Sequence, residues 1–306
     1  MSQPVFGAID VGTNSVLLLV ARREADGTFS PVRERAEITR LGKGVDATGQ
    51  LSAENLARTA EVVGQFATEA RALGAAKIAC VATSAARDAR NGAEFFAAVK
   101  AKAQLEPEII SGDEEAKLSY LAAERDFGGG PQVVLDIGGG STEFIFGSQG
   151  AVGFRRSFDL GSVRLTERHV RGDPPSAAER AAVESALDAA FAALPARPPD
   201  AEVVGIAGTV TTVFAVQRGI APYESARVHG QVLSRAEVQA CADRLWSLPL
   251  AARSELAGMQ PKRADVMPAG ASVLARALHA LGAEAVRVSD RGVRWGLLYA
   301  RFGAGA

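Results

Sequence analysis

The sequence has few of the residues that build metal centres or covalent cross-links. Its 306 residues include only two cysteines, Cys80 and Cys241, and three histidines that stand apart from one another. Two distant cysteines in apolar surroundings provide neither a disulfide framework nor a cysteine-based zinc site. Isolated histidines without ligand spacing argue against a histidine metal site. We therefore expect two buried reduced thiols and no zinc centre.

An excess of charge of either sign is also lacking. Lys and Arg number 34 and Asp and Glu number 35, so no overall field attracts nucleic acid or an acidic membrane surface. The apolar run near the N-terminus is interrupted by Asp10 and Asn14 and lacks a basic start and a cleavage site, so we expect neither a signal peptide nor a membrane span. The sequence predicts a cytoplasmic protein without a nucleic-acid or membrane partner, in which a local site holds any anionic ligand.

What the sequence does contain is an internal repeat. The stretch GAIDVGTNSVLLLVAR near the start is echoed by VVLDIGGGSTEFIFGS in the middle. In each copy an apolar run ends in Asp, a turn of small and hydroxyl residues follows, and a second strand-like run begins. A repeat spaced by about half the chain indicates two similar domains, and the length suffices for two separate cores.

Between and after these copies the pattern alternates helix and strand, which is typical of an α/β fold. The first domain is predicted to cover residues 1–125 and to end before the glycine-rich linker at 128–131. The second domain is predicted to cover residues 126–291. A C-terminal amphipathic helix within 292–306 is expected to pack back on the first domain.

Two helix starts in the second half are marked by capping boxes. Ser176 with Glu179, and Ser234 with Glu237, have the Ser-x-x-Glu spacing. In this motif the serine side chain accepts a hydrogen bond from the backbone N–H three residues on, and the glutamate reaches back to the serine N–H. Helices are therefore expected to begin directly after these two serines.

The glycine turns of the repeat are candidates for binding phosphate. A hairpin needs only one or two residues without a side chain, yet three glycines precede Ser141 and Thr142. The stretch lacks the last glycine of a dinucleotide fingerprint and the lysine of a P-loop. A strand–turn–strand whose bare N–H groups and hydroxyls surround an anion fits better. The alternative is a plain glycine-rich hairpin.

A third turn of small residues, GIAGTVTT at 205–212, ends a strand and opens a helix. A helix N-terminus attracts anions through its unpaired N–H groups and its dipole. Because Gly-Thr is also an ordinary helix start, this motif is weak alone. Together with the two Asp-containing turns it is expected to form a third wall of one cleft.

Two adjacent glutamates in IISGDEEAKLSYLAAERDF have different predicted roles. Ser111 and Glu114 have capping-box spacing, which gives Glu114 a structural role. Glu115 begins the helical stripe that contains Leu118 and Ser119 and should face the protein. Partial desolvation raises the proton affinity of a carboxylate and suits it as a general base or water-orienting group. The alternative is a solvated glutamate favoured by the helix dipole.

Arginines follow two predicted strands. Arg87, in VATSAARDA, is placed where loops of α/β domains commonly face a ligand crevice, and its planar fork can clamp a phosphate. The alternative for Arg87 is surface solvation. In VSDRGVRWG, Asp290, Arg291 and Arg294 surround a strand-to-helix junction at Gly292. An ion pair that fixes this junction is at least as well supported as a ligand contact.

Six ordered segments together resemble one protein family. DVGTNS, TSAAR, IISGDEEA, LDIGGGSTE, GIAGTVTT and VSDRGVRWG follow one another over essentially the whole chain. They are similar to motifs of the exopolyphosphatase and guanosine pentaphosphate phosphatase family, which belongs to the actin-like superfamily. The resemblance implies two ribonuclease-H-like domains around a central cleft, as in the short two-domain members, and a capacity to form a homodimer.

The resemblance also implies roles for individual residues. Glu115 would orient the attacking water. Asp136 and Glu143 would hold Mg²⁺ or another divalent cation, with Asp10 nearby. The residues implied to surround the phosphates are Thr13, Asn14, Ser15, Arg87, Gly138, Gly139, Gly140, Ser141, Gly208 and Thr209.

The activity implied by the resemblance is hydrolysis of a terminal phosphoanhydride. Inorganic polyphosphate is the expected substrate, and the 5′-γ-phosphate of guanosine pentaphosphate is the alternative. A sugar or acetate kinase would share the phosphate turns but would need an acceptor pocket and an adenine site. An actin-like or chaperone-like interaction protein would need insertions, for which 306 residues leave little room.

Overall fold

The computed structural model describes residues 3–303. The chain divides into two compact units, which are described separately. Unit 1 contains the described residues up to Ala122 and from Gly292 onward, and unit 2 is Ala123–Arg291. The division falls inside helix α5 (Gly112–Phe127), so the boundary predicted at residue 125 lies later in the same helix.

Unit 1 is built on a five-stranded sheet in the order β3-β2-β1-β4-β5. The first three strands form an antiparallel meander, and β4 and β5 extend the sheet in parallel from β1. The strands are β1 (Val5–Val11), β2 (Ser15–Arg23), β3 (Phe29–Ile38), β4 (Ala75–Ala82) and β5 (Glu108–Ile109).

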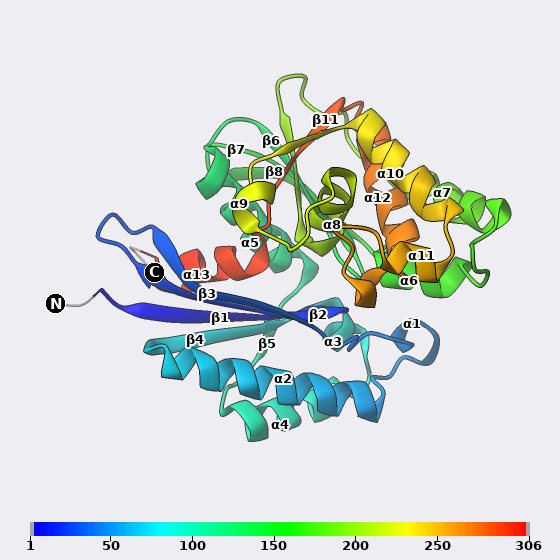
Figure 1. Ribbon diagram of the computed structural model, residues 1–306. Coiled ribbons are helices and arrows are strands. Elements are labelled where there is room, and N and C mark those ends of the chain that lie inside the picture. The colour runs from blue at the N-terminus through cyan, green and yellow to red at the C-terminus, as the bar shows by residue number, and fades with distance from the viewer. Residues whose placement is uncertain (1–2, 304–306) are drawn as a thin grey trace. The chain divides into compact units, whose positions relative to one another are not determined.

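Alternate side chains of this sheet enter two different cores, because successive residues of a strand point to opposite faces. One face, which includes Leu18, packs against α2 (Ala53–Ala72) and α4 (Gly92–Ala103). The other face, which includes Leu19, packs against α5 and α13 (Val293–Phe302). Figure 1 shows α2 and α4 on one side of these strands and α13 on the other. The short helices are α1 (Val45–Thr48) and α3 (Ser84–Asp88).

Unit 2 repeats this topology in a six-stranded sheet of order β10-β11-β9-β6-β7-β8. Here β6, β7 and β8 form the meander and β9 and β11 the parallel extension, while β10 adds an antiparallel edge. The repeat in the sequence is therefore a repeat of topology. The strands are β6 (Gln132–Ile137), β7 (Thr142–Ser148), β8 (Ala151–Phe158), β9 (Glu202–Ile206), β10 (Val232–Ser234) and β11 (Ala285–Val288).

Helices of unit 2 share one apolar core with its sheet, in which Phe144 and Leu274 are fully buried. The longer helices are α6 (Ser162–His169), α7 (Ala177–Phe191), α8 (Ala207–Arg218), α10 (Arg235–Ser247) and α12 (Met267–Ala280). The shorter ones are α9 (Ser225–Val228), α11 (Leu250–Ser254) and the 3-10 helix η1 (Pro261–Arg263). Among residues 3–303, no helix combines the length and apolar character needed to cross a membrane.

Both cysteines are free and buried, as predicted. Burial raises the pKa of the Cys80 thiol to about 12, with a further contribution from the charge of Asp10. Burial likewise raises the pKa of the Cys241 thiol to about 11. Both side chains therefore stay protonated at neutral pH and act as small apolar core residues.

The two predicted capping boxes are confirmed. At the start of α10, the Ser234 hydroxyl accepts from the Glu237 N–H at 3.2 Å, and Glu237 accepts from the Ser234 N–H at 2.8 Å. A hydrogen bond from Arg218 and those from Ser234 hold the pKa of Glu237 at about 2, below its usual value of 4.5. The ionised carboxylate therefore stabilises the folded unit.

Glu237→Gln should make acid unfolding less steep. The depressed pKa means that this stabilisation is complete above pH 4.5 and is lost as the pH falls toward about 2. The variant should be less stable than the parent at pH 7, and the difference should shrink below pH 4.5. Denaturant unfolding followed by circular dichroism at several pH values would measure it, with the exposed Glu255→Gln as control. A stability difference that does not depend on pH would contradict the interpretation.

Candidate functional site

In unit 1 the loop Gly12–Ser15 joins β1 to β2. Gly12 N–H donates to the Ser15 carbonyl at 3.0 Å, and the hydroxyl oxygens of Thr13 and Ser84 lie 2.7 Å apart. Asp10, near the end of β1, is 9% exposed. The structure therefore gathers four predicted residues at one strand–turn–strand junction, namely Asp10, Thr13, Asn14 and Ser15.

In unit 2 the loop Gly138–Ser141 has the same place between β6 and β7. It is closed by the same hydrogen bond, from Gly138 N–H to the Ser141 carbonyl at 3.0 Å. A Cβ atom on Gly12 or on Gly138 would lie 3.3 Å from the carbonyl oxygen that closes its own loop. The two loops thus share a backbone conformation as well as a sequence pattern.

The carbonyl groups of the unit 2 loop have partners on α6. Those of Gly138 and Gly139 accept from backbone N–H groups of residues 162–164, at 2.9 to 3.1 Å. The Gly140 carbonyl accepts from Arg164 Nε at 2.9 Å. In a trans peptide the N–H points opposite to the C=O, so the N–H groups of residues 139–141 point away from α6. Consecutive N–H groups on one side of a loop form an anion-binding concavity.

The unit 1 loop is arranged in the same way. The Thr13 carbonyl accepts from Gly42 N–H at 2.8 Å, and the Asn14 carbonyl accepts from the N–H groups of residues 39 and 40 at 3.1 and 2.9 Å. The N–H groups that follow these carbonyls, on Asn14 and Ser15, therefore point away from the segment after β3. Each unit carries its own candidate phosphate loop.

A Leu-Gly dipeptide after the third strand supports the loop of each unit. A Cβ atom on Gly161 would lie 2.4 Å from the carbonyl of Gly139, and one on Gly42 would lie 2.4 Å from the Thr13 methyl group. Only glycine permits such an approach. Our sequence analysis missed both glycines. Aligning the two halves would have revealed the signal, because Leu-Gly recurs at 41–42 and 160–161.

Two buried carboxylates lie side by side in unit 2. Asp136 on β6 and Glu143 on β7 are direct partners in the antiparallel register and are 6% and 1% exposed. Directly paired residues have side chains on the same face of a sheet. Glu143 Oε1 accepts a hydrogen bond from Ser157 Oγ on β8 at 2.6 Å. The carboxylates of Asp136 and Glu143 therefore lie next to each other on one face of the sheet, beside the glycine loop.

In unit 1 Glu115 lies in the first turn of α5 and is 8% exposed, which confirms its predicted burial. Arg87 Nη1 lies 3.7 Å from Glu115 Oε2 and donates to the Ile110 carbonyl at 3.2 Å. Arg87 is thus held beside Glu115 and is not extended into solvent. The neighbouring Glu114 donates its N–H to Ser111 Oγ at 3.2 Å, which is the serine half of the predicted capping box.

Three helix N-termini meet around the unit 2 loop. Ser162, at the start of α6, donates its N–H to the Gly138 carbonyl at 3.0 Å. A Cβ atom on Gly270, at the start of α12, would lie 3.1 Å from Ser162 Cβ and 2.9 Å from the methyl group of Thr209 on α8. Helix N-termini carry partial positive charge, and at α6 the first N–H groups are paired with the carbonyls of Gly138 and Gly139. The sequence analysis predicted only the α8 terminus.

The start of α8 also lies against the guanidinium of Arg263, a partly buried residue of η1. A Cβ atom on Gly208 would lie 1.8 Å from Arg263 Nη1, so a larger residue at 208 would force the guanidinium to move. Burial lowers the pKa of Arg263, although a guanidinium remains charged at neutral pH. Ala207, just before Gly208, has φ 69°, a costly conformation for a residue with a side chain.

Comparison with known proteins decides the family. The sequence pattern of the Ppx/GppA phosphatase family matches residues 19–303. This chain belongs to that family. The Mycobacterium tuberculosis protein named Exopolyphosphatase 2 is 38% identical over 308 residues, which cover 95% of this chain and 96% of that protein. The predicted family membership is therefore confirmed.

Two further Ppx/GppA relatives bear on fold and activity. The crystal structure of the Aquifex aeolicus family member has a TM-score of 0.82 at 31% identity and covers 97% of both chains. The Vibrio cholerae guanosine-5′-triphosphate,3′-diphosphate pyrophosphatase is 31% identical over 98% of this chain but only 59% of its own length. The α/β fold with two ribonuclease-H-like units, predicted from the repeat and the resemblance, is confirmed.

Two acidic residues of this Ppx/GppA chain suit a divalent cation whose remaining ligands are water and substrate phosphates. Among residues 3–303, no group of three or more His, Cys, Asp or Glu side chains is arranged to hold a metal. Mg²⁺, however, commonly takes one or two carboxylates together with water and substrate phosphates. Asp136 and Glu143 provide such a pair in unit 2, while Asp10 has the corresponding strand position in unit 1.

The VSDRGVRWG motif forms ion pairs, which was one of the two roles predicted for it; the other was a ligand contact. Arg291 Nη1 lies 2.7 Å from Asp126 Oδ1 in unit 2, and Arg294 pairs with Glu34 in unit 1. His229, which has no acidic residue at ligand spacing in the sequence, lies 3.3 Å from Asp290 Oδ1 and 3.8 Å from Asp126 Oδ2 in the fold. These residues are far apart in the sequence, so only the fold reveals the cluster.

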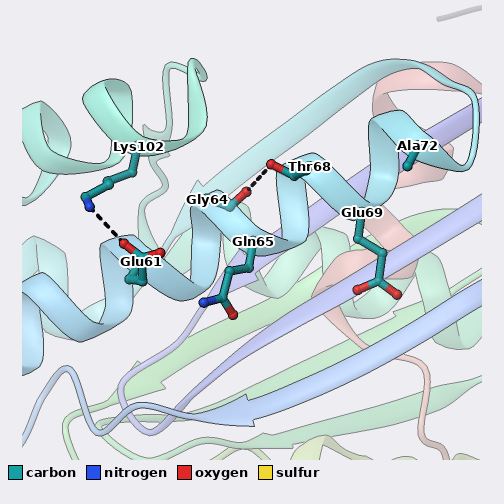
Figure 2. Close-up of a pocket in the computed structure, with 7 residues that line it drawn as sticks. All are labelled: Glu61, Gly64, Gln65, Thr68, Glu69, Ala72 and Lys102. Carbon is teal, nitrogen blue, oxygen red and sulfur yellow. Dashed lines mark hydrogen bonds and ion pairs between the residues drawn. The ribbon is translucent and has the colours of Figure 1, made fainter.

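A surface groove of about 430 Å³ on α2 contains none of the predicted site residues. Figure 2 shows Lys102 paired with Glu61 at one end of the groove, and Lys102 Nζ lies 2.8 Å from Glu61 Oε2. Glu69, farther along α2, pairs with Arg33 and Arg35 at 2.8 and 3.0 Å. Both carboxylates of the groove, Glu61 and Glu69, are therefore already paired with basic side chains. The remaining lining residues are Gly64, Gln65, Thr68 and Ala72.

Proposed function

We propose that this chain is an exopolyphosphatase that releases terminal orthophosphate from inorganic polyphosphate in a divalent-cation-dependent hydrolysis. The observation that carries the proposal is the pair of matching loops, Gly12–Ser15 and Gly138–Ser141, each with an Asp before it and consecutive N–H groups directed away from its supporting segment. The 38% identity to the mycobacterial Exopolyphosphatase 2 over 95% of the chain supports the same substrate.

Unit 2 supplies most of the groups that attract phosphate. N–H groups of residues 139–141, the starts of α8 and α12, and the Arg263 guanidinium all favour negative charge. Asp136 and Glu143 are the residues that would hold a divalent cation, with Mg²⁺ as the proposed ion. Such a cation, when bound, neutralises charge on the phosphoryl oxygens. Gly208 and Thr209 would bind phosphate at the start of α8.

Unit 1 supplies the residues that act on water. Glu115 is buried, acidic and held near Arg87, so it can accept a hydrogen bond from an attacking water and orient that water. The planar guanidinium of Arg87 can bind phosphate oxygens. Phosphoryl transfer has a loose transition state, which makes positioning and charge neutralisation the main contributions of the protein. Thr13, Asn14 and Ser15 would bind phosphate through their loop.

Phosphate release by the purified protein tests this function. Long-chain polyphosphate, guanosine pentaphosphate and ATP would be compared with Mg²⁺ at matched concentrations, with and without a chelator. We expect release from polyphosphate that the chelator abolishes. Faster release from guanosine pentaphosphate would favour the alternative substrate, which the Vibrio cholerae relative supports. Absence of release from all three would contradict both.

We further propose a cytoplasmic location and a homodimer. Free, buried cysteines suit a reducing compartment. The balance of 34 basic and 35 acidic residues supports the absence of nucleic-acid and membrane partners. Light scattering of the purified protein would measure the mass of the assembly, and a monomer at micromolar concentration would contradict the dimer.

A further inference from the structure

Ser157 belongs to none of the motifs of the sequence, yet it contacts one of the two buried carboxylates of unit 2. Its hydroxyl lies 2.6 Å from Glu143 Oε1. Ser157 is the direct partner of Glu143 between β7 and β8, and Glu143 is the direct partner of Asp136 between β6 and β7. Because paired residues share a face of the sheet, the three side chains form a row across three strands.

Chemistry fixes the direction of this hydrogen bond. An ionised carboxylate can only accept, so the hydroxyl of Ser157 donates to Glu143. A hydrogen bond to a charged acceptor is shorter and stronger than one between neutral groups. Glu143 is 1% exposed, so little water competes for its oxygens. The bond therefore restricts the carboxylate to one orientation.

The strand that carries Ser157 is itself well anchored. Its neighbour Phe158 is buried, with its ring 5.7 Å from that of Phe144 and 5.5 Å from that of Phe191. Thr142, the backbone partner of Phe158, donates its hydroxyl to the Leu160 carbonyl at 2.6 Å. These contacts fix the end of β8, so the Ser157 hydroxyl is held at a defined place beside Glu143.

We propose that Ser157 is a positioning residue that sets the orientation in which the Glu143 carboxylate meets a divalent cation. The inference rests on the proposed function, which gives Glu143 that role. Hydrogen-bond partners of metal ligands typically contribute about 10–100-fold to metal affinity or activity. A hydroxyl that merely satisfied a buried carboxylate would instead change stability without changing metal binding.

Three variants distinguish a serine that orients Glu143 for a cation from one that only satisfies a buried carboxylate. Ser157→Ala removes the donor, Ser157→Thr retains it on a β-branched side chain suited to a strand, and Ser148→Ala removes a hydroxyl elsewhere in the same sheet. Binding of Mn²⁺ to the protein without substrate would be followed by electron paramagnetic resonance. Turnover, the half-saturating Mg²⁺ concentration and the thermal midpoint would be measured in parallel.

We expect Ser157→Ala to weaken Mn²⁺ binding by about tenfold and to raise the half-saturating Mg²⁺ concentration similarly. Ser157→Thr should restore both toward the parent values, and Ser148→Ala should match the parent. Parent-like Mn²⁺ binding by Ser157→Ala, or failure of threonine to restore it in a folded protein, would overturn the inference. So would a parent protein that binds no Mn²⁺. A parent that binds Mn²⁺ but hydrolyses no phosphoanhydride would refute the proposed function alone, because the binding comparison would still decide the role of Ser157.

Discussion

Glu115→Gln should lower turnover by about a hundredfold or more and leave the protein folded. Glutamine has nearly the same shape as glutamate, so it fits the 8% exposed position at the start of α5. It lacks the negative charge and the second acceptor oxygen with which a carboxylate orients water and accepts its proton. The loss should therefore appear in kcat with polyphosphate, while the KM should change little.

The adjacent Glu114→Gln is the matched control. Glu114 lies in the same helical turn but is more exposed than Glu115, and its Oε1 lies 3.6 Å from Arg301. Its substitution removes the same charge from the same helix terminus, so both variants lose the same helix-dipole interaction. Turnover of Glu114→Gln should stay close to that of the parent. If Glu115→Gln is folded and equally active, Glu115 has no part in orienting water.

Gly161→Ala is expected to displace the unit 2 loop, because Gly161 lies against the side of the loop opposite its N–H groups. The added Cβ would lie 2.4 Å from the carbonyl carbon and oxygen of Gly139 and 2.6 Å from the Gly140 nitrogen. Backbone atoms cannot yield as a flexible side chain can, so the loop must move. Overpacking of this kind typically costs about 1–3 kcal/mol of stability. Misplacing N–H donors that face developing charge costs about 100-fold or more in turnover.

Gly153→Ala controls for the loss of a glycine in the same unit. Gly153 lies on β8, and a Cβ atom there would meet only the Phe146 carbonyl, at an ordinary 3.9 Å. This variant should keep the activity of the parent, and its stability should stay the same or rise by about 0.5 kcal/mol because alanine loses less backbone entropy. Phosphate release and denaturant unfolding would be measured for both variants. Equal activity of Gly161→Ala and Gly153→Ala would show that the close approach is not needed.

Local sequence signals were sufficient for the features that depend on neighbouring residues. The Asp and glycine pattern predicted both loops, because a strand, a turn and a second strand are contiguous in the chain. The helical stripe predicted the burial of Glu115, and the Ser-x-x-Glu spacing predicted both capping boxes. The duplication predicted that the two halves would share a fold.

Features that depend on distant residues escaped the sequence analysis. Gly161 is special only because the loop 138–141 folds against it, and Gly270 only because Ser162 and Thr209 come to lie beside it. A single glycine in a sequence does not predict such partners. Ser157 could not be predicted either, since its role depends on the strand register that places it opposite Glu143. Register and packing are properties of the folded chain.

The path of the chain through its two units also has a consequence for folding during synthesis. Unit 2 is one uninterrupted segment, whereas unit 1 needs α13, which buries Trp295 and Leu297 against β1, β2 and α5. Gly296 fits this place closely, because a Cβ there would lie 1.9 Å from the Leu118 carbonyl. The ribosome releases α13 only after all of unit 2 has been made. The unit that is started first is therefore completed last, and one apolar face of its sheet stays partly uncovered, with α5 but without α13, while the later unit is made.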